Sequence, residues 1–228
     1  MEQKETEKKQ KKIGRQQVMR MLFYLAGMVI LAFGITMNTK TGLGVSPIIS
    51  IAYSVSTIWD LNFGNMTMAL YCVFVIAQFI IRVKDRKWSD LLQIPVALLV
   101  SQLLNLFSWL MRDFHFENFW INLAFLILAI LLTGLGVVLS VDMRLVPNPG
   151  DGIVQAISDR TGKSLGLTKN LFDIGCIITT IALGLTMEGK LIGIGLGTVL
   201  AVIGVGRAIA LFNLLLWGPI TKAAGLME

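Results

Sequence analysis

Charged residues are scarce in this chain, and their scarcity excludes most classes of soluble protein. Asp, Glu, Lys and Arg make up only 15% of the 228 residues, 55% are hydrophobic, and the mean hydropathy is +0.73. A typical soluble domain has about 25% charged residues. Because a run of roughly 20 apolar residues crosses the hydrocarbon of a bilayer, and several such runs follow one another here, the composition predicts a polytopic membrane protein.

Residues that carry catalytic or metal chemistry are also few. The single histidine, His115, lies in a predicted outer loop, and the sequence has no HExxH, GxSxG or Walker pattern. Cys72 and Cys176 lie inside apolar segments without zinc or disulfide spacing, which predicts packing roles. We therefore expect no enzyme activity, no cofactor and no metal site. Any transport would be passive, ion-coupled or driven by a separate subunit.

Six apolar segments are long enough to span a membrane, which predicts an all-α integral membrane protein. They are residues 18–37, 66–81, 91–111, 119–141, 167–187 and 191–217. No small-residue cleavage site follows the first segment, so it is predicted to stay as a helix rather than to be removed as a signal peptide.

The segments divide the chain into two membrane repeats with polar ends. We expect a Lys-rich cytoplasmic tail (1–17), a first membrane repeat (18–111), an outer connection (112–118), a second membrane repeat (119–217) and a C-terminal cytoplasmic tail (218–228). The first tail is predicted to be solvated and mobile, and nucleic-acid binding is not expected of it.

Basic residues predict the orientation, since Lys and Arg of short loops collect in the cytoplasm. The predicted cytoplasmic set is Arg15, Arg20, Arg82, Lys84, Arg86, Lys87, the connection from Arg144 to Lys169, and Lys222, whereas the outer loops keep Lys40, Arg112 and Lys190. Both termini are therefore predicted to be cytoplasmic. This bias accounts for the net charge of +6, so the basic composition indicates no acidic partner beyond anionic membrane lipid.

Two connections, residues 38–64 and 142–166, are too long and too apolar to be simple loops. The first holds a short helix at 47–59, entered by Gly42-Leu43-Gly44-Val45-Ser46. The second holds one at 152–159, entered by Pro147-Asn148-Pro149-Gly150-Asp151. At about 1.5 Å per residue such helices reach only half-way through the hydrocarbon, which predicts re-entrant or interfacial elements.

The order helix, broken segment, helix, helix occurs twice along the chain. Matching residues are Gly34 with Gly136, Leu43 with Leu145, Ile48-Ile49 with Ile153-Val154, Cys72 with Cys176, and Leu106-Phe107 with Leu211-Phe212. Each half has three spans, an odd number, so the second half is predicted to be inverted. In inverted-repeat transporters, broken helices at equivalent positions point to the binding site.

The broken segments supply the first candidate substrate-binding residues, which are Gly44, Ser46, Pro47, Gly150, Asp151 and Gly152. Ser46 and Asp151 are predicted helix caps, and Pro47 suits a first helical turn. If both helix N-termini lie near mid-membrane, their free N–H groups would attract an anion or a carboxylate. The alternative is that both are interfacial turns capped by their own side chains.

Polar residues within the spans supply the remaining candidates. Lys169 and Asp173 are four apart on one helix face, and Arg207 lies at a depth similar to that of Asp173 on the next helix, so an ion pair between helices is geometrically plausible. Such groups could hold the bundle together, take part in substrate binding or proton coupling, or snorkel to the interface. Gln102 is the approximate repeat counterpart of Arg207 and would line a pore or join two helices.

The broken segments also carry a resemblance to a known family. The stretches are Gly42-Leu43-Gly44-Val45-Ser46-Pro47, Gly64, Pro149-Gly150-Asp151-Gly152, Arg160-Thr161-Gly162-Lys163-Ser164, Lys169 with Asp173, and Gly193-Ile194-Gly195-Leu196-Gly197-Thr198. Over most of residues 18–215 the chain resembles the YczE/YitT-type family of small bacterial membrane proteins, and more closely its YczE-like branch. The resemblance implies a bacterial cytoplasmic-membrane protein and names no substrate.

Two departures from the family pattern affect the candidate site. Gly150 replaces the arginine of a usual Pro-Arg-Asp-Gly, and Lys169 with Asp173 stand where the family favours Arg and Glu.

These features favour a small secondary transporter or permease for a small, anionic or carboxylate-bearing solute, with its site between the broken helices and with Asp173 and Arg207 tuning it. Two alternatives stay open, namely a substrate-capturing subunit of an ATP-driven transporter and a non-transporting scaffold or regulatory protein. Gly193 and Gly197 have the GxxxG spacing, a weak cue for a homodimer.

Overall fold

A computed structural model describes residues 2–82, 88–114 and 116–226, and for residues 2–13 and 89 it describes the backbone only. Within these ranges the chain is helical and contains no strand. The elements are α1 (Glu2–Lys40), α2 (Pro47–Ile58), α3 (Phe63–Ile81), the 3-10 helix η1 (Trp88–Leu92), α4 (Gln93–Leu110), α5 (Phe119–Val141), α6 (Pro149–Thr161), α7 (Leu165–Glu188) and α8 (Leu196–Ala223).

Six of these helices, α1, α3, α4, α5, α7 and α8, are long and apolar enough to cross a membrane. The prediction of an all-α membrane protein with six spans is confirmed. The two remaining α-helices, α2 and α6, have 12 and 13 residues. At about 1.5 Å per residue they are roughly 20 Å long, too short to cross about 30 Å of hydrocarbon.

Several boundaries differ from the prediction; for example, α8 continues to Ala223 rather than ending at residue 217. The Lys-rich N-terminal segment is the first part of α1 rather than an irregular tail, because Lys, Glu and Gln are strong helix formers and continue the helix of the span. The short helix α6 begins at Pro149, not Gly152, and α8 begins at Leu196, not at residue 191. The predictions for Lys84, Arg86, Lys87 and His115 concern residues outside the described ranges.

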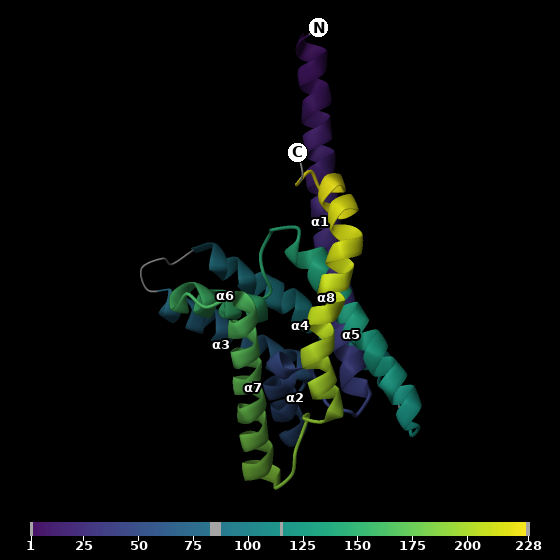
Figure 1. Ribbon diagram of the computed structural model, residues 1–228, viewed down its shortest axis with the longest axis vertical. Helices are drawn as coiled ribbons and strands as arrows, with labels where there is room; N and C mark the ends of the chain where they lie inside the picture. Colours follow the sequence, from purple (N-terminus) through teal and green to yellow (C-terminus); the bar gives the residue numbers. More distant parts are fainter. Residues whose placement is uncertain (1, 83–87, 115, 227–228) are drawn as a thin grey trace.

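The long helices α1 and α5 pack closely against each other, and α8 runs beside them (Figure 1). Glycines permit the close approach. A Cβ atom on Gly34 would lie 2.8 Å from the backbone nitrogen of Thr133, and one on Gly136 would lie 2.5 Å from the backbone nitrogen of Leu31. Any larger residue at either position would push the two helices apart.

Helices α4 and α8 pack on this pair, and the remaining helices pack on one another across the two halves of the chain. Helix α4 packs on α1, and α8 packs on α5. Helix α2 packs on α7, where the hydroxyls of Ser50 and Thr180 share a hydrogen bond of 2.7 Å, and α3 packs on α6. Both chain termini lie at the same end of the molecule (Figure 1), as an even number of spans requires.

The connection before α8 pairs with the entry to α2. The backbone nitrogen of Val45 donates to the carbonyl of Gly193 (2.9 Å), and that of Gly197 donates to the carbonyl of Leu43 (2.6 Å). A Cβ atom on Gly197 would lie 2.8 Å from the carbonyl oxygen of Gly44. The spacing of Gly193 and Gly197, which suggested a dimer contact, therefore serves a contact within the chain.

Helices α3 and α4 lie along each other, whereas α7 and α8 diverge. In the first pair, the backbone nitrogen of Gly64 donates to the side-chain oxygen of Asn105 (3.0 Å), and the Ser101 hydroxyl donates to the Gly64 carbonyl (2.8 Å). In the second pair, α7 packs on α2 and α6, and α8 packs on α5 (Figure 1).

Candidate binding cavity between the short helices

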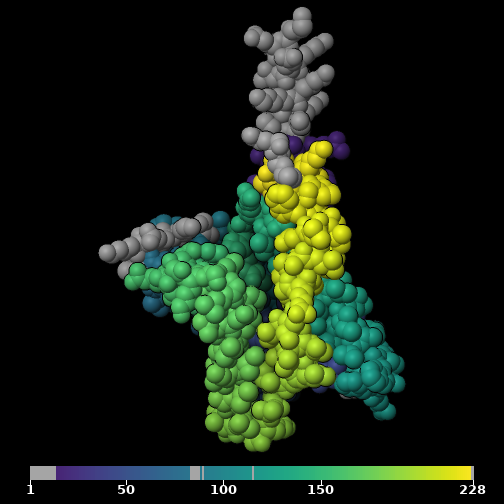
Figure 2. Space-filling view, in the orientation of Figure 1, coloured from purple at the N-terminus to yellow at the C-terminus, as the bar shows by residue number. Residues whose placement is uncertain are grey.

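A cavity of about 600 Å³ lies where the N-termini of α2 and α6 meet. Helix α2 contributes Ser46 and Ile48, and α6 contributes Gly150, Asp151 and Gly152. The remaining walls come from α1, α5 and α8, from α3, η1, α4 and α7, and from the connection between α5 and α6. In the space-filling view a recess separates α6 and the upper part of α7 from α8 (Figure 2).

The N-terminus of α2 leaves a polar group facing this cavity. Pro47 is the first helical residue, as predicted, and Ser46 is the N-cap with φ −59° and ψ 139°. The Ser46 hydroxyl makes no capping hydrogen bond. Because Ser46 lines the cavity, its hydroxyl is available to a solute.

The N-terminus of α6 repeats this geometry with a different cap. Asn148 is the N-cap, with the same φ and ψ as Ser46, and its side-chain oxygen accepts from the backbone nitrogen of Gly150 (3.3 Å). Asp151 was predicted to be the cap, and this prediction was wrong. Asp151 is the third helical residue, because Pro149 takes the first helical position and fixes the cap at the residue before it. The Asp151 carboxylate is thereby left free to line the cavity.

The two N-termini are in contact, and glycines make this possible. A Cβ atom on Gly150 would lie 3.1 Å from a methyl group of Ile48. A Cβ atom on Gly152 would lie 2.7 Å from the side-chain oxygen of Gln93 and 2.8 Å from that of Gln78. The first turn of α6 is therefore seated on α2 and on two glutamines.

These glutamines, Gln78 on α3 and Gln93 on α4, were missed from the sequence. Both are fully buried, and their amides exchange two hydrogen bonds, from Gln78 Nε2 to Gln93 Oε1 (3.1 Å) and from Gln93 Nε2 to Gln78 Oε1 (2.9 Å). A signal was present, because a glutamine within an apolar span needs a partner in the bundle.

The charges at the cavity belong to α6 and α7. The Lys169 ammonium lines the cavity and pairs with the Asp173 carboxylate at 3.2 Å, as their spacing of four on one helix face permits. Burial raises the pKa of Asp151 above its ordinary value, while the Lys169 ammonium lowers it and the Asp173 carboxylate raises it. The cavity therefore offers an amine and a carboxyl group whose proton affinity is increased.

An ion-pair cluster that sequence reasoning also missed borders the cavity. Arg82, at the end of α3, pairs with Asp90 of η1 (2.5 Å) and with Asp159 of α6 (3.5 Å). Gln155 donates to the same Asp159 carboxylate (2.6 Å). Arg82, Asp90 and Gln155 also line the cavity, so the cluster fixes α6 beside it.

The structure does not bring the other predicted residues into the cavity lining. Gly44 has φ +107° and packs against Gly195, and Pro47 is buried behind the lining. Gln102 and Arg207 are exposed on α4 and α8.

The suggested ion pair between Asp173 and Arg207 was wrong, because α7 and α8 diverge and Asp173 pairs with Lys169. Equal depth along two helices does not place two side chains on facing sides.

Comparison with protein families matches residues 18–214 to a family described as "Family of unknown function (DUF6198)". The chain belongs to this family. Two curated relatives come from Bacillus subtilis (strain 168). The "Uncharacterized membrane protein YczE" is 25% identical over 190 residues, covering 83% of each chain. The "Uncharacterized protein YyaS" is 23% identical over 185 residues, covering 81% of this chain and 87% of the relative.

The DUF6198 match includes both short helices and the whole cavity lining. The predicted resemblance to YczE-like proteins is confirmed, and with the six apolar helices it identifies an integral membrane protein. No solved structure matches the chain.

Proposed function

We propose that the protein is a small secondary transporter or permease for a small solute, with its central site in the cavity between α2 and α6. One observation carries the proposal. Two helices too short to span the membrane meet N-terminus to N-terminus at one cavity, with the same cap conformation. Broken helices whose N-termini converge on a midplane site are typical of secondary transporters.

The helix contacts support an inverted repeat. If α1 to α4 correspond to α5 to α8, the contact of α2 with α7 has its counterpart in that of α3 with α6, and α1 with α4 in α5 with α8. The central crossing follows the same rule. Gly34 corresponds to Gly136, and with this spacing Leu31 corresponds to Thr133, so the Gly34–Thr133 approach repeats the Gly136–Leu31 approach. A two-fold relation in the membrane plane explains both sets of contacts.

The polar groups of the cavity define the solute class. The partial positive charge at the N-terminus of α2, the Ser46 hydroxyl and the Lys169 ammonium favour a carboxylate or another anionic group. The Asp151 carboxyl group would take a proton or a cationic group of the same solute. Apolar side chains such as Leu31, Val137 and Val205 would contact the rest of the solute.

The proposed location is the bacterial cytoplasmic membrane, with both termini in the cytoplasm. At the end of the molecule that carries the termini, the Arg20 guanidinium donates to the carbonyls of Met143 (2.5 Å) and Arg144 (2.8 Å). Three basic side chains, Arg20, Arg82 and Arg144, thus belong to that end, as the positive-inside rule expects of a cytoplasmic face.

The test is a thermal-unfolding screen of the detergent-purified protein against anions, amino acids, vitamins and cations, because a ligand that binds only the folded state stabilises it. We expect a saturable shift that Asp151→Asn or Lys169→Gln abolishes and that Asp113→Asn, an exposed carboxylate of the outer connection, leaves intact. The ligand found is then tested for counterflow in proteoliposomes. A broad library without any shift on a monodisperse sample would favour the scaffold alternative.

One observation favours the second candidate, a substrate-capturing subunit that works with a partner. Arg207 is exposed about half-way along α8, where a charge facing hydrocarbon is costly unless another group covers it. A membrane-embedded partner subunit would cover it. Co-purification of a nucleotide-binding module and a second membrane chain, lost on Arg207→Leu, would support this candidate, and purification of the chain alone from its native membrane would oppose it.

A further inference from the structure

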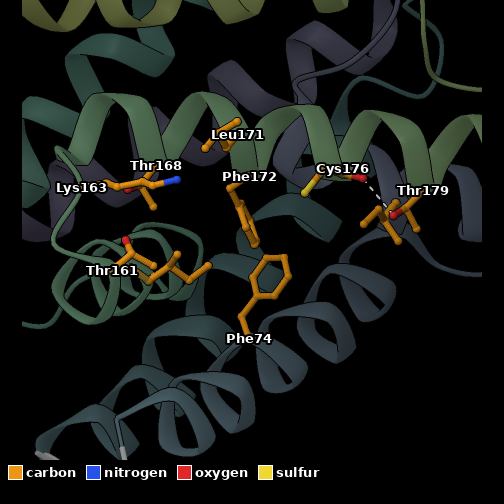
Figure 3. Close-up of a pocket in the computed structure, with 11 residues that line it drawn as sticks. Phe74, Thr161, Lys163, Thr168, Leu171, Phe172, Cys176 and Thr179 are labelled. Atoms are coloured by element: carbon orange, nitrogen blue, oxygen red, sulfur yellow. Dashed lines mark hydrogen bonds between the residues drawn. The ribbon is translucent and has the colours of Figure 1, made fainter.

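A second hollow, of about 440 Å³, lies along α7 and shares no lining residue with the central cavity. Its walls come from α2, α3, α6 and α7. Phe74 of α3 and Phe172 of α7 meet at its middle, with ring centroids 5.4 Å apart (Figure 3). We call this hollow the α7 groove.

One end of the α7 groove is polar and carries an unpaired cation. Lys163, Thr161 and Thr168 lie together there (Figure 3). The Lys163 side chain is exposed and takes part in none of the salt bridges of the described residues. Its carbonyl accepts from the Ser158 hydroxyl (2.8 Å), which fixes the backbone of the connection. The ammonium group is therefore held at the groove's end and is free to bind an anion.

The rest of the α7 groove is apolar and faces outward. Leu171 and Gly175 are exposed, and Cys176 and Phe74 form its floor. From Thr168 to the far end of the groove the lining follows α7 for about 16 Å at roughly 1.5 Å per residue. This is about half of a hydrocarbon core of roughly 30 Å, the depth of one leaflet.

We propose that the α7 groove is a binding site for an anionic phospholipid. The phosphate binds beside the Lys163 ammonium, and one acyl chain lies along Phe172 and Gly175. Two observations select this ligand. The single cation is at the end of an apolar groove, which complements a negative headgroup joined to a hydrocarbon chain. The groove is also as deep as one leaflet, and on the proposed orientation its polar end lies on the cytoplasmic side.

Thermal unfolding of the full-length, detergent-purified protein tests the lipid preference. Phosphatidylglycerol and phosphatidylcholine with the same acyl chains are titrated in turn. We expect both to stabilise the protein and phosphatidylglycerol to reach half-maximal effect at about one fifth of the concentration, as one lysine beside an anionic headgroup implies. Inorganic phosphate alone should give no shift. Equal midpoints for the two lipids, or a shift produced by phosphate, would overturn the proposal.

Two groups of variants locate the site. A Cβ atom on Gly175 would meet nothing within 4 Å, so Gly175→Leu fills the α7 groove without disturbing the fold. Gly206→Leu on α8, at an exposed position that is equally open, is its control. Gly175→Leu should abolish the saturable lipid shift, and Gly206→Leu should leave it unchanged.

The second group of variants tests the role of the Lys163 charge. Lys163→Gln should remove the preference for phosphatidylglycerol while keeping the effect of phosphatidylcholine, and Lys163→Arg should restore the preference. Lys190→Gln, an exposed lysine at the opposite end of α7, should have no effect. A preference that survives both Gly175→Leu and Lys163→Gln would place lipid binding elsewhere. A change of oligomeric state on Gly175→Leu alone would assign the groove to a second copy of the chain.

Discussion

Helices α3 and α4 pack along each other, whereas α7 and α8, their counterparts on the proposed repeat, diverge. The closed pair is held by the hydrogen bonds among Gly64, Ser101 and Asn105. In the open pair, Lys169 of α7 and Val205 of α8 line the same cavity instead of packing on each other. On the proposed repeat, the contact of α2 with α7 has its counterpart in that of α3 with α6, whereas the packing of α3 on α4 has none between α7 and α8, and the cavity lies beside the open pair.

On the proposed transport function, this difference describes a step of the cycle. Alternating access in inverted-repeat transporters exchanges the arrangements of the two repeats around a fixed site. The opposite state would bring α7 and α8 together and separate α3 from α4. Four experiments test this contrast, and the change that we expect decreases from the first experiment to the last.

The largest effect is expected for thiol labelling at two equivalent positions. The spacing that relates Leu106-Phe107 to Leu211-Phe212 also relates Val100 to Val205. The Val100 side chain has 0% exposure, whereas the Val205 side chain lines the cavity. In a variant without Cys72 and Cys176, Val205→Cys should react with a small maleimide in nanodiscs and Val100→Cys should not. Both should react after denaturation. Equal labelling in the native state would remove the contrast.

The next effect is expected when the closed pair is forced apart. A Cβ atom at Gly64 would overlap Asn105 and the backbone carbonyl of Ser101, so Gly64→Val should lower the free energy of unfolding by about 1–3 kcal/mol. Gly206→Val on α8 meets nothing within 4 Å and serves as the control. Thermal unfolding in detergent measures both variants. A wild-type-like midpoint for Gly64→Val would show that α3 and α4 are not tightly joined.

A comparable but recoverable effect is expected at the buried amide pair under α6. Gln78→Leu alone leaves the Gln93 amide unpaired, which should cost about 1–3 kcal/mol, because a buried polar group without a partner keeps its full desolvation penalty. The double variant Gln78→Leu/Gln93→Leu should recover most of this loss. A double-mutant cycle from unfolding midpoints measures the coupling, and additive losses would argue against the pairing.

The smallest effect is expected from the titration of Asp151. Its pKa is raised by burial, so the folded state holds the proton more tightly than the unfolded state, and stability falls as pH rises from about 4 through the folded pKa. Asp151→Asn removes this contribution. The midpoint of the wild type minus that of Asp151→Asn should therefore decrease with rising pH. Asp142, whose pKa burial also raises, is present in both proteins and cancels. A difference independent of pH would contradict the assignment.

The elements that could be predicted depend on local chemistry. Spans follow from the cost of placing polar backbone and charge in hydrocarbon, and the start of α2 follows from Pro47, whose missing N–H suits a first turn. The same reasoning applied to Pro149 would have given Asn148 as the cap of α6. The Lys169–Asp173 pair was predictable because residues four apart share a helix face.

The elements that could not be predicted depend on rotation and partner choice. Hydropathy gives the depth of Gln102 and Arg207 but not the direction in which each side chain points, and both are exposed. The Gln78–Gln93 pair requires α3 and α4 to be in register, which no local pattern encodes. Hydropathy does not indicate the divergence of α7 from α8 either, because α3, α4, α7 and α8 are all long and apolar enough to span a membrane.

The crossing of α1 with α5 also sets the order of assembly during synthesis. Helix α1 cannot bury its glycine face until α5, which begins at Phe119, has entered the membrane, and α2 must wait for α7. Helices α3 and α4 can already pair through Gly64, Ser101 and Asn105, whereas α1 and α2 would lack these partners while the ribosome completes the chain. The two halves form one cooperative unit, so fragments 1–111 and 112–228 expressed together should assemble, whereas either fragment alone should be degraded.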